Sequence, residues 1–97
     1  MSAYLIARVD VTNPEGYEEY RAGVPAVIAK YGGRYLVRGG AVEVLEGSGG
    51  SGRRVVLEFP SMAQLKAFWE SPEYRPLRAL RERNATSNIV AVEGFPG

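Results

Sequence analysis

The chain has 97 residues, a formal net charge of +1, and neither histidine nor cysteine. This length suits one compact domain, which we place at residues 1–97. The near-neutral charge argues against a general binder of nucleic-acid backbones, because such proteins carry a clear basic excess. The lack of cysteine excludes disulfides and thiolate metal sites, and the lack of histidine removes the commonest general base and metal ligand. We therefore expect neither a metal site nor a cofactor.

The N-terminal residues lead directly into a strand-like pattern, without the basic region and long apolar core of a signal peptide. No apolar stretch approaches the length that a membrane-spanning helix needs. We therefore expect a cytoplasmic protein of bacterial type with no membrane partner.

The first third of the chain predicts a strand followed by a helix. Residues 3–11 alternate between an apolar face and a mixed face, which is typical of a strand. An Asn-Pro pair follows and favours a helix start, and the Gly-Gly pair at 32–33 favours a helix end. The spacing of apolar residues predicts a helix over 14–31, with a kink at Pro25.

The rest of the chain continues with strands and helices in a recognisable order. The further predicted elements are strands over 34–38 and 41–46, a strand over 53–59, helices that begin at Ser61 and at Ser71, and a strand over 89–92. The order β-α-β-β-α-β is the ferredoxin-like unit, an α+β fold with an antiparallel sheet and helices on one face.

The sheet face opposite the helices would be bare in a single chain. It would carry Tyr4, Ile6, Leu36 and Val56. An apolar face of this kind is rarely left in water. Two such sheets packed together would cover it, so we expect a homodimer through the sheet faces.

The chain contains four short sequence motifs in a fixed order. They are YLVRGG at 35–40, LEG at 45–47, RVVLEFPS at 54–61 and SPEY at 71–74. Together they resemble the DUF1330 family, small bacterial proteins of the dimeric α/β-barrel kind, and the resemblance covers nearly the whole chain. It implies the ferredoxin-like fold and the dimer. The activity of that family is unknown, so the resemblance implies no reaction and leaves the catalytic residues unassigned.

The segment GSGGSG at 47–52 matches the pattern of a dinucleotide-binding loop. That fingerprint requires a strand before it and a helix after it, and here it would join two strands. We interpret it as a flexible hairpin loop that resembles an engineered linker.

Five charged residues are predicted to lie on the bare sheet face. They are Arg8, Asp10, Arg38, Arg54 and Glu58. Buried charges must be paired or bound to a ligand, and the planar fork of arginine suits a carboxylate or phosphate. Two interpretations are open: a pocket for a small anionic ligand, or a salt-bridge network at a dimer interface.

Tyrosines could line a space between the helices and the sheet. They are Tyr17, Tyr20, Tyr31, Tyr35 and Tyr74. Tyr20 and Tyr74 are the candidates for ligand binding, since a tyrosine near a helix end can lean over the sheet. The alternative is core packing with each hydroxyl at the surface.

The last predicted helix is rich in arginine. We expect a solvated face there, except at Arg81, which falls near the inward stripe and is expected to bond Glu46 or a neighbouring carbonyl.

Three functions compete at this point. The first is binding or transforming a small anionic, carboxylate-type metabolite in a barrel pocket, and the second is a non-catalytic structural or interaction dimer. The third is RNA recognition, because RNA-recognition modules share the element order. Such modules stack bases on aromatic residues of the central strands, and the open face here offers only Tyr4. We therefore expect no nucleic-acid partner.

Overall fold

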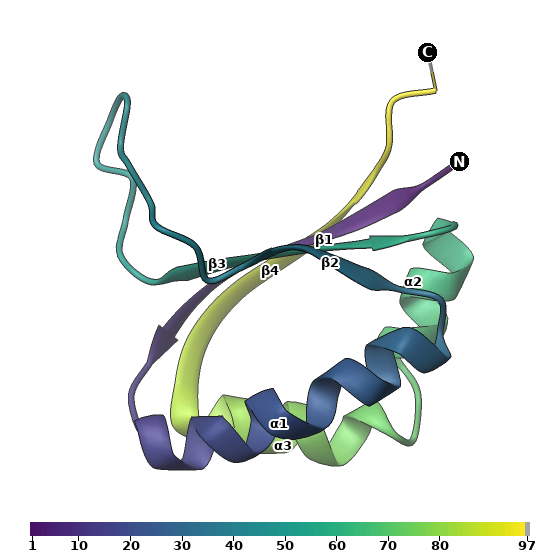
Figure 1. Ribbon diagram of the computed structural model, residues 1–97, viewed down its shortest axis with the longest axis horizontal. Helices are drawn as coiled ribbons and strands as arrows, with labels where there is room; N and C mark the ends of the chain where they lie inside the picture. Colours follow the sequence, from purple (N-terminus) through teal and green to yellow (C-terminus); the bar gives the residue numbers. More distant parts are fainter. Residues whose placement is uncertain (97) are drawn as a thin grey trace.

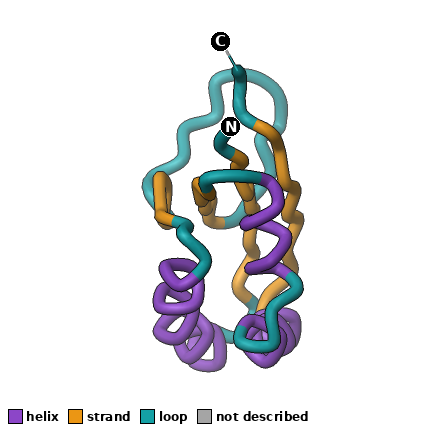
Figure 2. The backbone as a smooth tube through the Cα atoms, turned by 90° about the vertical axis from the view of Figure 1, so that its right-hand side faces the viewer, coloured by secondary structure: helices purple, strands orange, loops and turns teal. Residues whose placement is uncertain are grey.

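The computed structural model describes residues 1–96 as two layers, a four-stranded antiparallel sheet with three helices on one side of it (Figure 1). The elements in chain order are β1 (Ala3–Val11), α1 (Pro14–Lys30), β2 (Arg34–Arg38), β3 (Arg53–Phe59), α2 (Met62–Trp69), α3 (Tyr74–Asn84) and β4 (Ala85–Glu93). This confirms the predicted α+β, ferredoxin-like fold. Figure 2 shows α1 and α3 below the strands and α2 beside them.

The sheet has the order β2-β3-β1-β4, with every neighbouring pair antiparallel. Alternation along β1 sends Leu5, Ala7 and Val9 toward the helices, where they are almost fully buried. Apolar residues of α1 and α2, among them Ile28 and Phe68, cover them and complete the core.

Helices α1 and α3 lie side by side below the sheet, and two glycines of α1 allow their close approach. A Cβ atom at Gly16 would overlap the side-chain amide of Asn84, and one at Gly23 would lie 2.9 Å from Leu77 Cδ2. Asn84 also closes α3, since its Nδ2 donates to the carbonyl of Leu80 at 2.7 Å. Side chains of α3 therefore pack directly against the backbone of α1 at these two glycines.

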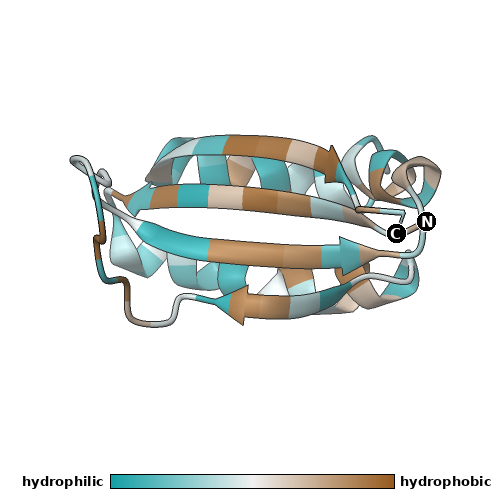
Figure 3. Cartoon of the chain, turned by 90° about the horizontal axis from the view of Figure 1, so that it is seen from above, coloured by the Kyte–Doolittle hydropathy of each residue, from teal (hydrophilic) through white to brown (hydrophobic). Residues whose placement is uncertain are grey.

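The outer sheet face, on the far side from the helices, carries an apolar row across all four strands (Figure 3). The strand register sets Ile6 opposite both Val56 and Val90, and Val56 opposite Val37. Ile6 is 42% exposed and Val90 57%. We call this set the valine row.

The connection between β2 and β3 differs from the prediction. Residues 41–46 form no strand, and residues 39–52 leave the sheet as coil on the side away from the helices (Figure 1). The pairing ends where Gly39 donates its N–H to the carbonyl of Arg54 at 2.8 Å, and Gly39 has a φ of +71°. This left-handed backbone turns the chain out of the sheet.

The faces of β2 also differ from a simple alternation. The register shifts between Tyr35 and Val37, so Tyr35 pairs with the inward Leu57, while Val37 pairs with Val56 of the outer face. Arg38 then pairs with Val55 and turns to the helix side of the sheet. The prediction that Arg38 lies on the bare face is therefore wrong, because a bulge inserts one residue and exchanges the faces beyond it.

Candidate functional site

Three of the predicted ligand-binding residues lie on the outer face at the loop end of the sheet. Arg54 donates to the carbonyls of Gly49, Ser51 and Gly52 at 2.6 to 3.0 Å. Asp10 accepts a hydrogen bond of 2.8 Å from the hydroxyl of Ser51. Arg8 pairs with Arg54 across the sheet and lies beside the same loop. Arg54 and Asp10 therefore hold the glycine-serine loop.

Glu58 lies on the outer face at the opposite end of β3. Its Oε1 pairs with Arg34 at 2.6 Å, and its Oε2 accepts a 3.3 Å hydrogen bond from Tyr4. The hydrogen bond from Arg34 is the main reason that the pKa of Glu58 lies below its ordinary value. The predicted cluster is therefore split: neither Arg38 nor Arg54 is the partner of Glu58.

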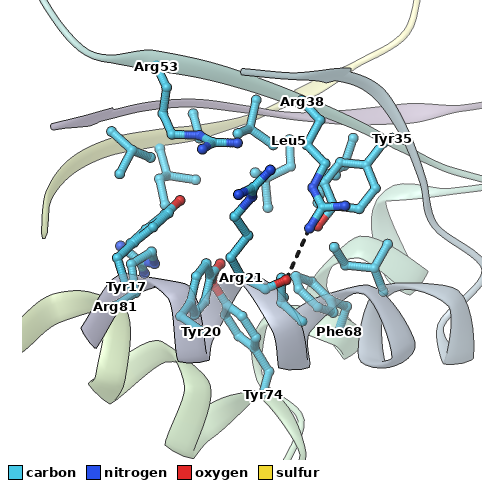
Figure 4. A pocket seen from close by; sticks show the side chains of 17 residues that line it. Leu5, Tyr17, Tyr20, Arg21, Tyr35, Arg38, Arg53, Phe68, Tyr74 and Arg81 are labelled. Carbon is cyan, nitrogen blue, oxygen red and sulfur yellow. Dashed lines mark hydrogen bonds between the residues drawn. The ribbon is translucent and has the colours of Figure 1, made fainter. Parts of the chain in front are cut away.

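The remaining three predicted residues, Tyr20, Arg38 and Tyr74, come together on the helix side of the sheet, where they line one cavity of about 40 Å³ (Figure 4). Its polar lining consists of arginines and tyrosines only: Tyr17, Tyr20, Arg21, Tyr35, Arg38, Arg53, Tyr74 and Arg81. Apolar residues of β1, β3, β4, α1 and α2 complete it, and no carboxylate lines it. We call it the arginine–tyrosine cavity.

The four arginines of this cavity differ in burial. Arg21 and Arg38 are exposed, Arg53 is half-buried, and Arg81 is only 5% exposed. Figure 4 shows the side chains of Arg21, Arg38 and Arg53 directed into the space below the strands. The charge therefore extends from the surface into the interior.

Arg38 is held at the cavity by the backbone of α1. Its Nη2 donates to the carbonyl of Arg21 at 3.0 Å, and its guanidinium lies 4.7 Å from the ring centre of Tyr35. The Arg21 carbonyl is free to accept because the residue four positions later is Pro25, which has no N–H. The proline inside α1 thus creates the acceptor that orients Arg38.

The deeper arginines keep unused donors. Arg53 lies 5.7 Å from the ring centre of Tyr17, and Arg81 lies 6.0 Å from that of Tyr20. Within residues 1–96, the Nε atoms of both arginines are buried and have no hydrogen-bond partner. A buried cationic donor without a partner is costly unless a ligand satisfies it.

The tyrosines act as neutral hydroxyls at this site. Burial raises the pKa of Tyr17 and of Tyr35, and the nearby Arg53 and Arg38 offset this only in part. Burial, followed by the neighbouring Tyr74, raises the pKa of Tyr20 further. The hydroxyls of Tyr20 and Tyr74 are 3.1 Å apart, so one donates to the other and the second proton stays free.

The chemistry of this lining is therefore one-sided. Guanidinium groups and protonated phenols offer hydrogen-bond donors, and the cations carry the only formal charge. Such a set of donors is suited to an anion, and a carboxylate matches the planar fork of arginine in a bidentate way. The same donors can also stabilise negative charge that develops on a bound oxygen.

Two predictions about individual side chains were wrong. Tyr31 does not line the arginine–tyrosine cavity and instead donates to Glu73 Oε1 at 2.9 Å. Arg81 does not bond Glu46, because Glu46 belongs to the loop on the far side of the sheet. Among residues 1–96, no group of three or more acidic side chains is arranged to hold a metal ion.

Sequence reasoning missed Arg21 and Arg53 altogether. Arg21 follows Tyr17 by four residues and so shares its helix face. Arg53 is in phase with Val55 and Leu57 along β3, which sends it inward. Both signals were present, and extending each periodicity to the end of its element would have found them.

Comparison with known protein families assigns the chain to a family. The DUF1330 model, a domain of unknown function, matches residues 2–95. The chain belongs to the DUF1330 family. No curated protein matches it. Across residues 1–96 no helix is both long and apolar enough to cross a membrane.

Solved structures agree on the fold of this DUF1330 protein. A Rhodopseudomonas palustris protein of unknown function has a TM-score of 0.79 at 18% identity, over 99% of this chain and 84% of that one. A dimeric ferredoxin-like protein of unknown function from Jannaschia has a TM-score of 0.73 at 13% identity, over 97% and 100% of the two chains. SnoaB, a cofactor-independent oxygenase from Streptomyces nogalater, has a TM-score of 0.64 at 14% identity, over 99% of this chain and 95% of that one. At these identities the likeness concerns the fold.

Proposed function

We propose that this DUF1330 protein binds a small carboxylate-type metabolite in the arginine–tyrosine cavity. The observation that carries the proposal is the convergence of four arginines on a cavity without a single carboxylate in its lining. The buried, unpartnered Nε of Arg81 and of Arg53 support it, since these donors await an acceptor. The hydroxyls of Tyr17 and Tyr20, whose pKa values burial raises, add neutral donors around the same space.

The proposed site lies on the helix side of the sheet, whereas the sequence predicted charged ligand-binding residues on the open face. Arg54, Asp10 and Glu58 are engaged with protein groups and favour the structural interpretation of the outer cluster. Arg38, Tyr20 and Tyr74 remain ligand-binding candidates. Arg53 and Arg81 join them, as does Arg21, whose Nη1 also forms an exposed ion pair with Glu18 at 3.4 Å.

We also propose a homodimer in which two outer faces pack together. The valine row supports it, because the row crosses the whole sheet and leaves Ile6, Val37 and Val90 more than a third exposed. The dimeric state of the Jannaschia protein, which shares the fold, is a second support. The same surface favours the alternative function, a non-catalytic structural dimer. The expected cytoplasmic location stays a prediction.

Binding titrations separate the two functions. Isothermal titration with benzoate, succinate and octanoate should give saturable binding to the wild-type protein. Arg38→Met should weaken binding at least tenfold while costing less than about 1 kcal/mol of stability, because Arg38 pairs with one backbone carbonyl and no carboxylate. Arg54→Met, an arginine of the neighbouring strand that faces outward, is the control and should bind normally.

The opposite results have clear meanings. If none of the three carboxylates binds at millimolar concentration, the arginine–tyrosine cavity is no carboxylate site and the structural dimer is the better account. If Arg54→Met loses binding as fully as Arg38→Met, the ligand lies on the outer face.

A further inference from the structure

A second hollow lies on the helix side, between α2 and the edge strand β4. Its volume is about 350 Å³, much larger than the 40 Å³ of the arginine–tyrosine cavity. Its lining is mainly apolar: Leu5, Leu65, Lys66, Trp69, Glu70, Ile89, Val90 and Ala91. We call it the β4 groove. The two charged side chains are exposed: Lys66 belongs to α2, and Glu70 directly follows its last residue.

The β4 groove adjoins the arginine–tyrosine cavity. Leu5 and Ile89 line both, so these two side chains form the partition between them. The guanidinium of Arg81 lies 5.8 Å from the ring centre of Trp69, a residue of the groove. The most deeply buried charge of the cavity is therefore one side chain away from the apolar groove.

A third hollow, of about 210 Å³, shares Arg81 and Ile89 with the cavity and Trp69 and Ile89 with the groove. Arg78, Glu82 and Ser87 complete its lining, so one carboxylate lies on this side of Arg81. Among residues 1–96, the buried side-chain polar atoms without a partner are the Nε of Arg53, the Nε of Arg81 and the hydroxyl of Ser87. All three therefore lie at the arginine–tyrosine cavity or directly beside it.

The volumes decide what kind of ligand fits. At about 30 Å³ for each water-sized group, the arginine–tyrosine cavity has room for little more than one such group, which is enough for the oxygen end of a carboxylate. On the same measure the β4 groove has room for about ten further groups of that size. The arginines can therefore take the oxygen end of a carboxylate but not a whole metabolite.

We infer that the ligand is an amphipathic monocarboxylate whose head sits at Arg81 inside the arginine–tyrosine cavity and whose apolar body, of about eight to ten carbons, lies in the β4 groove against Trp69. This inference rests on the proposed function and names the ligand class of that site. The ligand would pass between the two spaces at Ile89, which is half-buried and lines both, and this requires its side chain to rotate.

The test is a chain-length series by isothermal titration with succinate, butyrate, hexanoate, octanoate and decanoate, below micelle-forming concentrations, and with octanol as an uncharged match. Affinity should rise about two- to fourfold with each added methylene, because each one leaves water for the groove. The rise should stop near ten carbons, where the groove ends. Octanol should bind at least tenfold more weakly than octanoate, since it cannot pair with a guanidinium.

A groove-filling variant locates the apolar body. Ala91→Phe adds a ring at an exposed position of the β4 groove and should remove the gain in affinity from hexanoate to decanoate. Thr86→Phe, on the same strand but paired with the outward Asp10, is the control and should keep the full gain.

The outcomes distinguish the inference from the proposed function. If succinate or butyrate binds as tightly as decanoate, or if Ala91→Phe keeps the chain-length gain, the amphipathic ligand is wrong and the carboxylate site stands. If no member of the series binds, both fall together.

Discussion

At the scale of single residues, the candidate site depends on where backbone acceptors and side-chain donors are left over. Pro25 leaves the carbonyl of Arg21 without a helical donor, and Arg38 takes that position at 3.0 Å. Arg53 and Arg81 keep buried Nε donors that no protein group uses. The Arg21 carbonyl therefore orients Arg38 at the entrance of the cavity, and the Nε donors of Arg53 and Arg81 are available to an anion.

Replacing Pro25 tests this arrangement. In Pro25→Ala the new N–H competes with Arg38 for the Arg21 carbonyl, so Arg38 loses its fixed position. We expect the stability of α1 to rise by about 1–3 kcal/mol, because an interior proline is removed. We expect carboxylate affinity to fall severalfold. Urea unfolding and isothermal titration measure the two effects, and equal or tighter binding would show that the proline does not orient the site.

At the scale of elements, the end of α1 is tied to the start of α3. Lys30 forms an ion pair with Glu73, and Tyr31 donates to the same carboxylate. These contacts, the bond from Lys30 foremost, lower the pKa of Glu73 to about 2 from an ordinary 4.5. The tie joins the two helices that carry Tyr20, Tyr74 and Arg81.

This tie predicts a dependence of stability on pH. Because the folded pKa of Glu73 is depressed, its contribution is fully present above pH 4.5 and is lost as the pH falls toward 2. Urea unfolding should show Glu73→Gln less stable than wild type at pH 6, with the difference shrinking as the pH approaches 2. Glu19→Gln, at an exposed position of α1, is the control. A difference that stays constant with pH would contradict the assignment.

The packing of α1 on α3 gives a second prediction at this scale. Gly16→Ala should destabilise the fold by about 1–2 kcal/mol, because the new methyl displaces the Asn84 amide from the Leu80 carbonyl. Gly40→Ala is the control, since a Cβ there meets nothing within 4 Å. Thermal unfolding checks both, and an unchanged or higher melting temperature for Gly16→Ala would show that the helices adjust freely.

The elements were predictable because alternation and capping are local signals. The strand of residues 3–11 and the helix end at Gly32, with its φ of +83°, follow from the sequence and are confirmed. The inward turn of Arg38 was not predictable, because the bulge arises from pairing between two strands and leaves no mark on either one alone. Tyr20 and Tyr74 were identified as candidates from the sequence, and Arg21 and Arg53 were missed although the helix and strand periodicities include them.

At the scale of the whole molecule, the two faces of the sheet carry different features. The helix side holds the arginine–tyrosine cavity and the β4 groove, and the outer face presents the valine row. The chain is a thin slab of 35 × 33 × 16 Å, so the sheet exposes a large area for its size. Pairing two outer faces would cover that area, including Val90 at the rim of the β4 groove, and would leave the arginine–tyrosine cavity on the other side of the sheet.

The dimer can be tested without touching the site. Val56→Lys places a charge at the centre of the valine row and should give a monomer by light scattering, because the partner would have to desolvate that charge. Val42→Lys, in the exposed loop, is the control. A dimer that survives Val56→Lys would place the interface elsewhere.

The central claim is that Arg81 is held in the interior for a ligand and not for the fold. The most direct test is urea unfolding of wild type and Arg81→Met, each with and without octanoate at a hundred times its dissociation constant. We expect Arg81→Met without ligand to lose no more than about 1 kcal/mol, because its buried Nε has no protein partner and methionine fills similar space. Octanoate should stabilise wild type by about 2.7 kcal/mol and the variant not at all. A loss of about 3–5 kcal/mol in Arg81→Met without ligand, or equal stabilisation of both proteins by octanoate, would contradict the account.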